Sequence, residues 1–187
     1  MLSKASRLLA NDHHEVEKIL KKIEIALEAG NVESLYVGLD LFWARLAVHI
    51  RAEHLHLFPI VLTASQESET LDEQLPGADK AQTTIAKLRD DHDFFMHELA
   101  NAVTQMREIR GVCELQAVRA TLKVVARTVG QVKQRLTEHN KAEEMQVYRW
   151  LTPMLDPVEL AKLASEISAE LSKRPPRFTE NVWTEID

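Results

Sequence analysis

The chain has 187 residues, of which 45% are hydrophobic and 28% charged, a composition that predicts one soluble globular domain. The formal net charge is -6 and basic residues are scattered among acidic ones, which argues against a nucleic-acid partner. No window approaches the roughly 18 uninterrupted apolar residues of a membrane span, and the amphipathic start is unlike a signal peptide, so we expect a cytoplasmic protein without a membrane partner.

Helix-forming residues dominate, with only 5 Gly and 6 Pro, and strand-like alternation is missing. The first helix is expected from about Leu2 to Ala29. Gly30 then stops it and Asn31 caps the second helix. This second helix should reach about Ala64, with Pro59 kinking it or ending its regular part.

A polar loop from Ser65 to Asp79 is expected next, followed by a third helix from about Asp79 to Ile109. A fourth helix reaches about Trp150, and Pro153 closes it. A short fifth helix should start with Asp156 as cap and run to about Lys173.

These elements predict an all-α protein. We expect an antiparallel up-down-up-down four-helix bundle at residues 1–155, with a short helix and tail at residues 156–187 packed on the same domain. The aromatic residues of the tail, Phe178 and Trp183, are expected to pin it to the bundle, and a contact with a partner is the alternative. The single cysteine, Cys113, is interpreted as a small buried packing residue.

One pattern occurs twice along the chain: a histidine, a glutamate four residues later and an aromatic residue five beyond that. The two copies are His49, Glu53 and Phe58, and His139, Glu143 and Tyr148. Each copy follows a Leu-x-x-Asp-His segment, which ends at His13 in the first half and at His92 in the second. Residues four apart lie about 40° apart around a helix, so each histidine faces the same way as its glutamate.

The spacing of these residues predicts that they meet in the core. Residues equidistant from a turn come level in antiparallel helices, and the midpoint between His13 and His49 is residue 31, at the predicted turn. Burying four imidazoles and two carboxylates without a cation would cost on the order of several kcal/mol per charge. We therefore predict a metal site, and the alternative is a purely structural helical protein. The predicted metal ligands are His13, His49, Glu53, His92, His139 and Glu143.

The donor types indicate which metals suit this site. Imidazole and carboxylate together suit iron, zinc or manganese. Two carboxylates facing each other across four imidazoles suit two ions bridged by Glu53 and Glu143. We expect two iron ions with an oxo or hydroxo bridge, for which zinc or manganese could substitute.

On these residues the chain resembles the hemerythrin-like proteins, the HHE cation-binding domain family, over about residues 8–155. The Leu-Phe-Pro sequence after Glu53 is also similar to that family. The resemblance implies a four-helix bundle with a non-haem di-iron centre at the six matching positions. Oxygen-carrying members have a fifth histidine where this chain has Met96, and His97 should miss the site because it lies about 100° further around the helix.

The expected function follows from this resemblance. It is a non-haem di-iron protein that binds dioxygen, nitric oxide or peroxide for sensing, scavenging or iron storage. A homodimer or a protein partner would carry any response. Whether the chain is an enzyme stays open, since the alternatives are a di-iron peroxidase or oxidase and an iron donor for iron-sulfur cluster repair. A ferritin-like oxidase would need two Glu-x-x-His motifs, and only Glu53 with His56 fits one at these positions.

Several further residues close to the ligands are candidates for their surroundings: Glu17, His56, Gln146 and Met96. His56 and Gln146 return to the inner face and could hydrogen-bond the ligands, although for His56 a simple core role is equally open. Glu17 could add a carboxylate or be a solvated surface charge. His14 and His54, one residue after a ligand, are expected to point away from the bundle axis.

Overall fold

The computed structural model describes residues 2–67 and 75–173. All regular elements in these two ranges are helical, without any strand, which confirms the predicted all-α class. In chain order the elements are α1 (Lys4–Ala29), α2 (Val32–Ala52), the π-helical turn η1 (Glu53–Leu57), α3 (Phe58–Glu67), α4 (Ala78–Ile109), α5 (Leu115–Ala142), the π-helical turn η2 (Glu143–Val147), α6 (Tyr148–Met154) and α7 (Pro157–Leu171).

The helix ends follow local sequence signals. α1 begins after Ser3, whose hydroxyl caps it, slightly later than the expected start at Leu2. Gly30 adopts the left-handed conformation at φ 63°, which glycine tolerates without strain, and the Asn31 side chain caps α2. The Asp156 carboxylate accepts backbone N–H bonds at the start of α7 in a capping box. These observations confirm the predicted turn at Gly30 and the predicted caps Asn31 and Asp156, whereas α3 ends at Glu67 rather than at Ala64 and α7 ends at Leu171 rather than at Lys173.

Both His–Glu motifs lead into a π-helical turn. The turns begin at Glu53 and Glu143, where the backbone bonds to the fifth residue rather than to the fourth and the helix widens. Pro59 was expected to kink or end the second helix. The irregularity instead occurs one turn earlier, and Pro59 follows as the second residue of α3, which continues to Glu67. Pro153 likewise lies inside α6, near its end at Met154.

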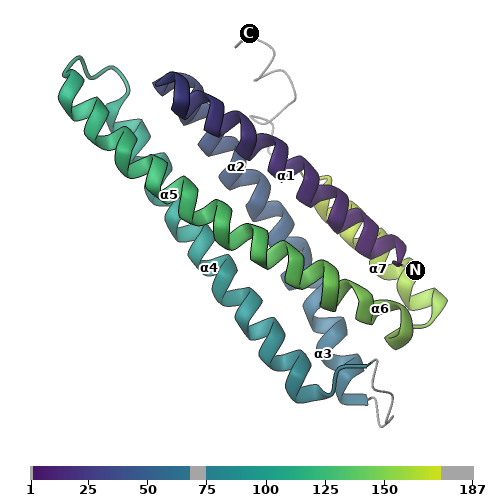
Figure 1. The fold of residues 1–187 in the computed structure, drawn as a ribbon. Helices are drawn as coiled ribbons and strands as arrows, with labels where there is room; N and C mark the ends of the chain where they lie inside the picture. Colours follow the sequence, from purple (N-terminus) through teal and green to yellow (C-terminus); the bar gives the residue numbers. More distant parts are fainter. Residues whose placement is uncertain (1, 68–74, 174–187) are drawn as a thin grey trace.

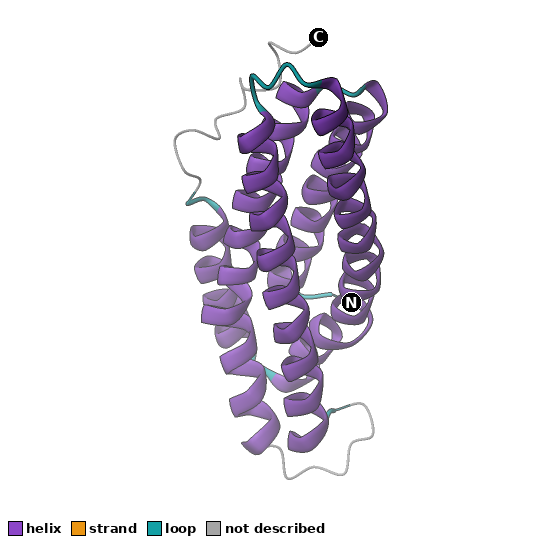
Figure 2. Ribbon diagram, turned by 90° about the vertical axis from the view of Figure 1, so that its left-hand side faces the viewer, coloured by secondary structure: helices purple, strands orange, loops and turns teal. Residues whose placement is uncertain are grey.

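Long helical segments lie side by side, as the two views in Figures 1 and 2 show. α1 packs against α2, α4 packs against α5, and α2 packs against α4. α7 packs against α1 and α2. Within residues 2–67 and 75–173, two separate apolar clusters fill the interior, one containing Phe42 and Phe95 and the other containing Leu9 and Phe58. The polar residues of the candidate site occupy the level between these clusters.

A few sequence-based expectations differ from the structure or lie outside it. Cys113 is exposed in the connection between α4 and α5, because a residue in a surface turn has no core to enter. Of the predicted loop from Ser65 to Asp79, the first three residues still belong to α3 and the last two begin α4. Phe178 and Trp183 lie outside the described residues. Among the described helices, none is both long and apolar enough to span a bilayer.

Candidate metal centre

The structure brings the six predicted ligands together in the interior. Two groups form, and in each the potential ligand atoms lie within 4.8 Å of one another. The groups are His13, His49, Glu53 and Glu143, and Glu53, His92, His139 and Glu143. Both glutamates belong to both groups, so the arrangement offers two adjoining metal positions that share two carboxylates. These buried His and Glu groups could bind metal.

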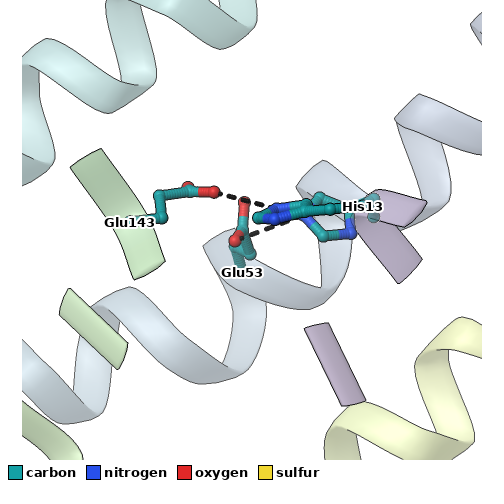
Figure 3. A group of neighbouring side chains, drawn as sticks. His13, Glu53 and Glu143 are labelled. Atoms are coloured by element: carbon teal, nitrogen blue, oxygen red, sulfur yellow. Dashed lines mark hydrogen bonds and ion pairs between the residues drawn. The ribbon is translucent and has the colours of Figure 1, made fainter. Parts of the chain in front are cut away.

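Each histidine of the cluster comes from a different helix. His13 lies on α1, His49 on α2, His92 on α4 and His139 on α5. The Nε2 atoms of His13 and His49 are 3.1 Å apart, and those of His92 and His139 are 3.0 Å apart. In Figure 3 the carboxylates of the two glutamates point toward the same space as the His13 ring, with Glu143 Oε2 lying 3.2 Å from His13 Nε2.

The carboxylate oxygens provide a test of whether a cation fits here. Glu53 and Glu143 are both 0% exposed. Glu53 Oε2 and Glu143 Oε1 have no hydrogen-bond partner among the described residues, although imidazole Nε2 atoms lie 3.3 and 3.1 Å from them. A buried carboxylate oxygen without a donor is costly. Four imidazole nitrogens that converge on two such carboxylate oxygens fit a metal site.

Neighbouring charged groups shift the pKa values of the buried glutamates and histidines of the cluster against the effect of burial. Burial alone would raise the pKa of Glu53, but His49 and His92 hold it well below its usual range. Burial would lower the pKa of His139, but Glu143 and Asp91 raise it to about 10. Glu143 also has a lowered pKa: burial and Glu53 oppose ionisation, and His139 and His13 outweigh them. The metal-free cluster therefore holds protons that a metal ion must displace.

The outward-facing nitrogen, Nδ1, of each histidine has its own partner. These partners are Glu144 for His13 at 2.9 Å, Asp12 for His49 at 3.0 Å, His54 for His92 at 2.9 Å and Asp91 for His139 at 3.2 Å. A carboxylate that accepts the Nδ1–H fixes the tautomer and leaves Nε2 free to bind a metal. The rings are thus held with Nε2 toward the cluster.

Two arginines complete this outer layer. Arg45 lies four residues before His49 and pairs with Asp12, while Arg135 lies four residues before His139 and donates to Asp91 at 2.5 Å. Arg45 is 10% exposed, and Arg135 is 39% exposed. The two aspartates thus each join an imidazole to a guanidinium, one deep in the protein and one close to its surface.

Tyr148 adds a hydroxyl to the cluster. It donates to Glu53 Oε1 at 2.8 Å and lies 3.2 Å from His13 Nε2. Burial, together with the two glutamates, raises the pKa of Tyr148 well above its ordinary value, so the hydroxyl keeps its proton. Its ring stacks on His13 at 5.7 Å, and Phe58 stacks on His92 in the same manner at 5.8 Å.

The other sequence candidates lie elsewhere. Glu17 is on the surface beside His14, and Gln146 is exposed. Met96 packs against an apolar cluster. His56 lies 3.7 Å from Glu166 on α7. None of these four contributes an atom to the two ligand groups.

The expectation for His54 was wrong. It was predicted to point away from the axis, yet its ring contacts His92. The wide π turn at Glu53–Leu57 changes the rotation between successive residues, and a regular helix was assumed. His14 is exposed, and so is His97, which bonds Asn101 away from the cluster, as predicted.

Sequence reasoning also missed a set of polar residues around the ligands: Asp12, Asp91, Glu144, Arg45, Arg135 and Tyr148. A signal for the aspartates was present, because the repeated Leu-x-x-Asp-His segments place an aspartate before a ligand in each half. Tyr148 was noticed only as the aromatic residue of the repeat. The partners of Nδ1 come from neighbouring helices, so their roles depend on distances that spacing along one helix does not give.

A cavity of about 430 Å³ adjoins the cluster between α4 and α5. Its lining includes His139 and Asp91 from the centre and also Lys87, Arg135 and Glu138, so it carries both basic and acidic groups. This cavity reaches the outer side of His139.

A protein-family model matches part of the chain. The model of the crossover junction endodeoxyribonuclease RuvC matches residues 77–168, slightly less than half of the chain. No curated protein and no solved structure matches. The matched residues run from the start of α4 into α7 and include three residues of the cluster, His92, His139 and Glu143. The match is too short to place the whole chain in that family.

This match contradicts the predicted membership of the hemerythrin-like family. It also contradicts the functions inferred from that resemblance: binding of dioxygen, nitric oxide or peroxide, and the alternatives of a di-iron peroxidase, oxidase or repair protein. The prediction of no nucleic-acid partner is contradicted as well, because the matched family is named for a nuclease. Short motifs carry a false-positive risk, and net charge does not describe local charge.

Proposed function

We propose that this chain is a metal-binding protein that holds two ions in the buried cluster. The proposed ligands are His13, His49, Glu53, His92, His139 and Glu143. The observation that carries the proposal is the pair of fully buried carboxylate oxygens, Glu53 Oε2 and Glu143 Oε1, which lack hydrogen-bond donors where four imidazole nitrogens converge. Two cations would compensate both carboxylates.

The donor set favours iron as the resident metal. Four imidazoles and two carboxylates suit iron, and zinc or manganese could occupy the same positions. The imidazole Nε2 atoms of the four histidines and the carboxylates of Glu53 and Glu143 would hold the ions. The proposal includes the alternating up-and-down order of four helices that the spacing predicts. When bound, such ions supply Lewis-acid activation of water and, for iron, one-electron chemistry.

The chain's own residues prepare this site. Asp12 and Asp91 orient His49 and His139 by accepting their Nδ1–H groups. Tyr148 holds a proton against Glu53 Oε1. The two apolar clusters on either side limit access of water to the polar level between them. Electrostatic interactions are strong in such surroundings.

Equilibrium dialysis of the metal-free protein against Fe(II) under anaerobic conditions tests the proposal. We expect two ions per chain for the unaltered protein. Glu53→Gln removes a shared carboxylate and should lower the content to one ion or none. His14→Gln, which changes an exposed histidine beside His13, is the matched control and should retain two. Absence of tight binding by the unaltered, folded chain would contradict the proposal.

The family match favours a second candidate, metal-dependent cleavage of DNA junctions. The cavity beside His139 supports it, because Lys87 on its lining could contact phosphate. A synthetic DNA crossover junction incubated with the protein and Mn²⁺ tests this candidate. Nicking that is lost in His139→Ala and weakened in Lys87→Ala would support it. Absence of nicking would reject junction cleavage and leave metal binding unaffected.

A further inference from the structure

The candidate centre has nearly matching halves. Each half has an Asp-His pair on one helix and an Arg, His and Glu at four-residue intervals on the next. The matching pairs are Asp12 and Asp91, His13 and His92, Arg45 and Arg135, His49 and His139, and Glu53 and Glu143. The contacts match too, since each aspartate joins the Nδ1 of the histidine on the next helix to the arginine. Because the halves match in these residues and contacts, a difference in metal affinity between them has to come from the positions at which they differ.

The first difference follows the bridging glutamates. Glu144 and His54 occupy corresponding positions, one residue after Glu143 and Glu53. Glu144 lies 2.9 Å from Nδ1 of His13, and His54 lies 2.9 Å from Nδ1 of His92. One ligand thus bonds an acid side chain, and the other bonds a second imidazole.

This difference changes how strongly the two histidines donate to a metal. A carboxylate that accepts the Nδ1–H of an imidazole increases the electron density at its Nε2 and compensates positive charge. An imidazole acceptor brings no formal negative charge. His13 is therefore the stronger metal ligand of the two, although Glu144 is 38% exposed and water screens part of its effect.

The second difference is at the aromatic positions of the repeat. Tyr148 stacks on His13 and brings its hydroxyl to 3.2 Å from His13 Nε2. Phe58 stacks on His92 and has no polar atom to offer. Both differences therefore place an additional polar group beside His13, and the anionic one, Glu144, is the group that strengthens this ligand.

We propose that the two metal positions are unequal and fill in order, with the first ion entering between His13 and His49 and the second between His92 and His139. The inference rests on the proposed function, because it concerns the same pair of ions. A partner of a metal-bound histidine typically changes metal affinity by about 10- to 100-fold. We expect the first dissociation constant to be smaller than the second by at least about tenfold, at the lower end of that range because Glu144 is partly exposed.

Calorimetric titration of the full metal-free chain with Zn(II) tests this order. The unaltered protein should show two separate steps. Glu144→Gln should weaken the tight step by about tenfold and bring the steps together. His54→Glu should strengthen the weaker step by a similar factor. Glu17→Gln is the control, because it removes one negative charge from an exposed side chain that pairs with His14 and lies outside both ligand groups, and it should leave both steps unchanged.

Removal of one histidine from each position identifies which fills first. His49→Ala should lose the tight step and keep the weak one, whereas His139→Ala should keep the tight step. Helical circular dichroism matching that of the unaltered chain establishes that each variant is folded. Two equal steps, or a tight step that survives in His49→Ala, would overturn the inference while leaving the two-metal proposal intact. Absence of any binding step in the unaltered chain would overturn both.

Discussion

Replacement of Asp12 by asparagine is expected to destabilise the protein more than the matching change at Asp91. The two aspartates make the same pair of contacts, to a ligand histidine and to an arginine. Their arginines differ in exposure, because Arg45 is 10% exposed and Arg135 is 39% exposed. Arg135 can turn to solvent when its carboxylate is lost, and Arg45 is held in the interior.

The size of each effect follows from this burial. Breaking a buried charge pair by removing one partner costs about 3–5 kcal/mol, which we expect for Asp12→Asn. For Asp91→Asn the loss is mainly the hydrogen bond to His139, about 1.5–3 kcal/mol, since a half-exposed ion pair adds less than about 1 kcal/mol. The expected difference between the two variants is therefore about 1–2 kcal/mol.

Urea unfolding of the metal-free protein, followed by circular dichroism, measures both variants. Their free energies of unfolding are compared at a common m-value, the slope of that free energy against urea concentration. Removing metal with a chelator keeps differences in metal affinity out of the comparison. Equal losses in the two variants, or a larger loss for Asp91→Asn, would refute the reasoning that burial of the arginine sets the cost.

Three further changes have definite expected results. Because the pKa of His139 is raised to about 10, its protonation stabilises the metal-free fold fully below about pH 6.5. This contribution is lost as the pH rises through about 10, so the urea midpoint should fall between pH 7 and pH 10.5; a rising midpoint would contradict this assignment. Tyr148→Phe removes the donor to Glu53 and should cost about 1–3 kcal/mol in the same urea assay, whereas an unchanged midpoint would show that this bond contributes nothing. Asp156→Ala removes the cap of α7 and should cost about 0.5–2 kcal/mol, seen as a melting temperature lower by about 2–4 °C per kcal/mol; no change would mean that the cap is dispensable.

The sequence was sufficient for those features that depend on local signals. Gly30, Asn31 and Asp156 mark helix ends through their own backbone preferences and hydrogen bonds, so their roles are visible without a structure. The convergence of the cluster was predicted from equal distances along helices that were expected to be antiparallel. His13 and His49 do meet across α1 and α2, as the midpoint at residue 31 predicts.

Other features depend on contacts that spacing along one helix does not encode. The π turns after Ala52 and Ala142 have no sequence signature that we recognised, and the error at His54 follows from treating the first turn as regular α-helix. The carboxylate of Glu144 reaches His13 from a helix far away in the chain. Cys113 shows how an average tendency toward burial fails for a residue in a surface turn.

The family prediction failed for a different reason. It rested on residue types at a short spacing, which the structure brings together but which do not by themselves identify a family. The match at residues 77–168 points to another family and to nucleic acid. Function therefore has to be tested at the cluster itself.

Anomalous X-ray diffraction from crystals of the iron-loaded protein, recorded at the iron absorption edge, tests the central claim most directly. Two anomalous peaks in the cluster are expected, one beside His13 and His49 and the other beside His92 and His139, with Glu53 and Glu143 between them. An iron-loaded crystal with no peak in the cluster, or with peaks only at the surface, would contradict the proposed two-metal centre.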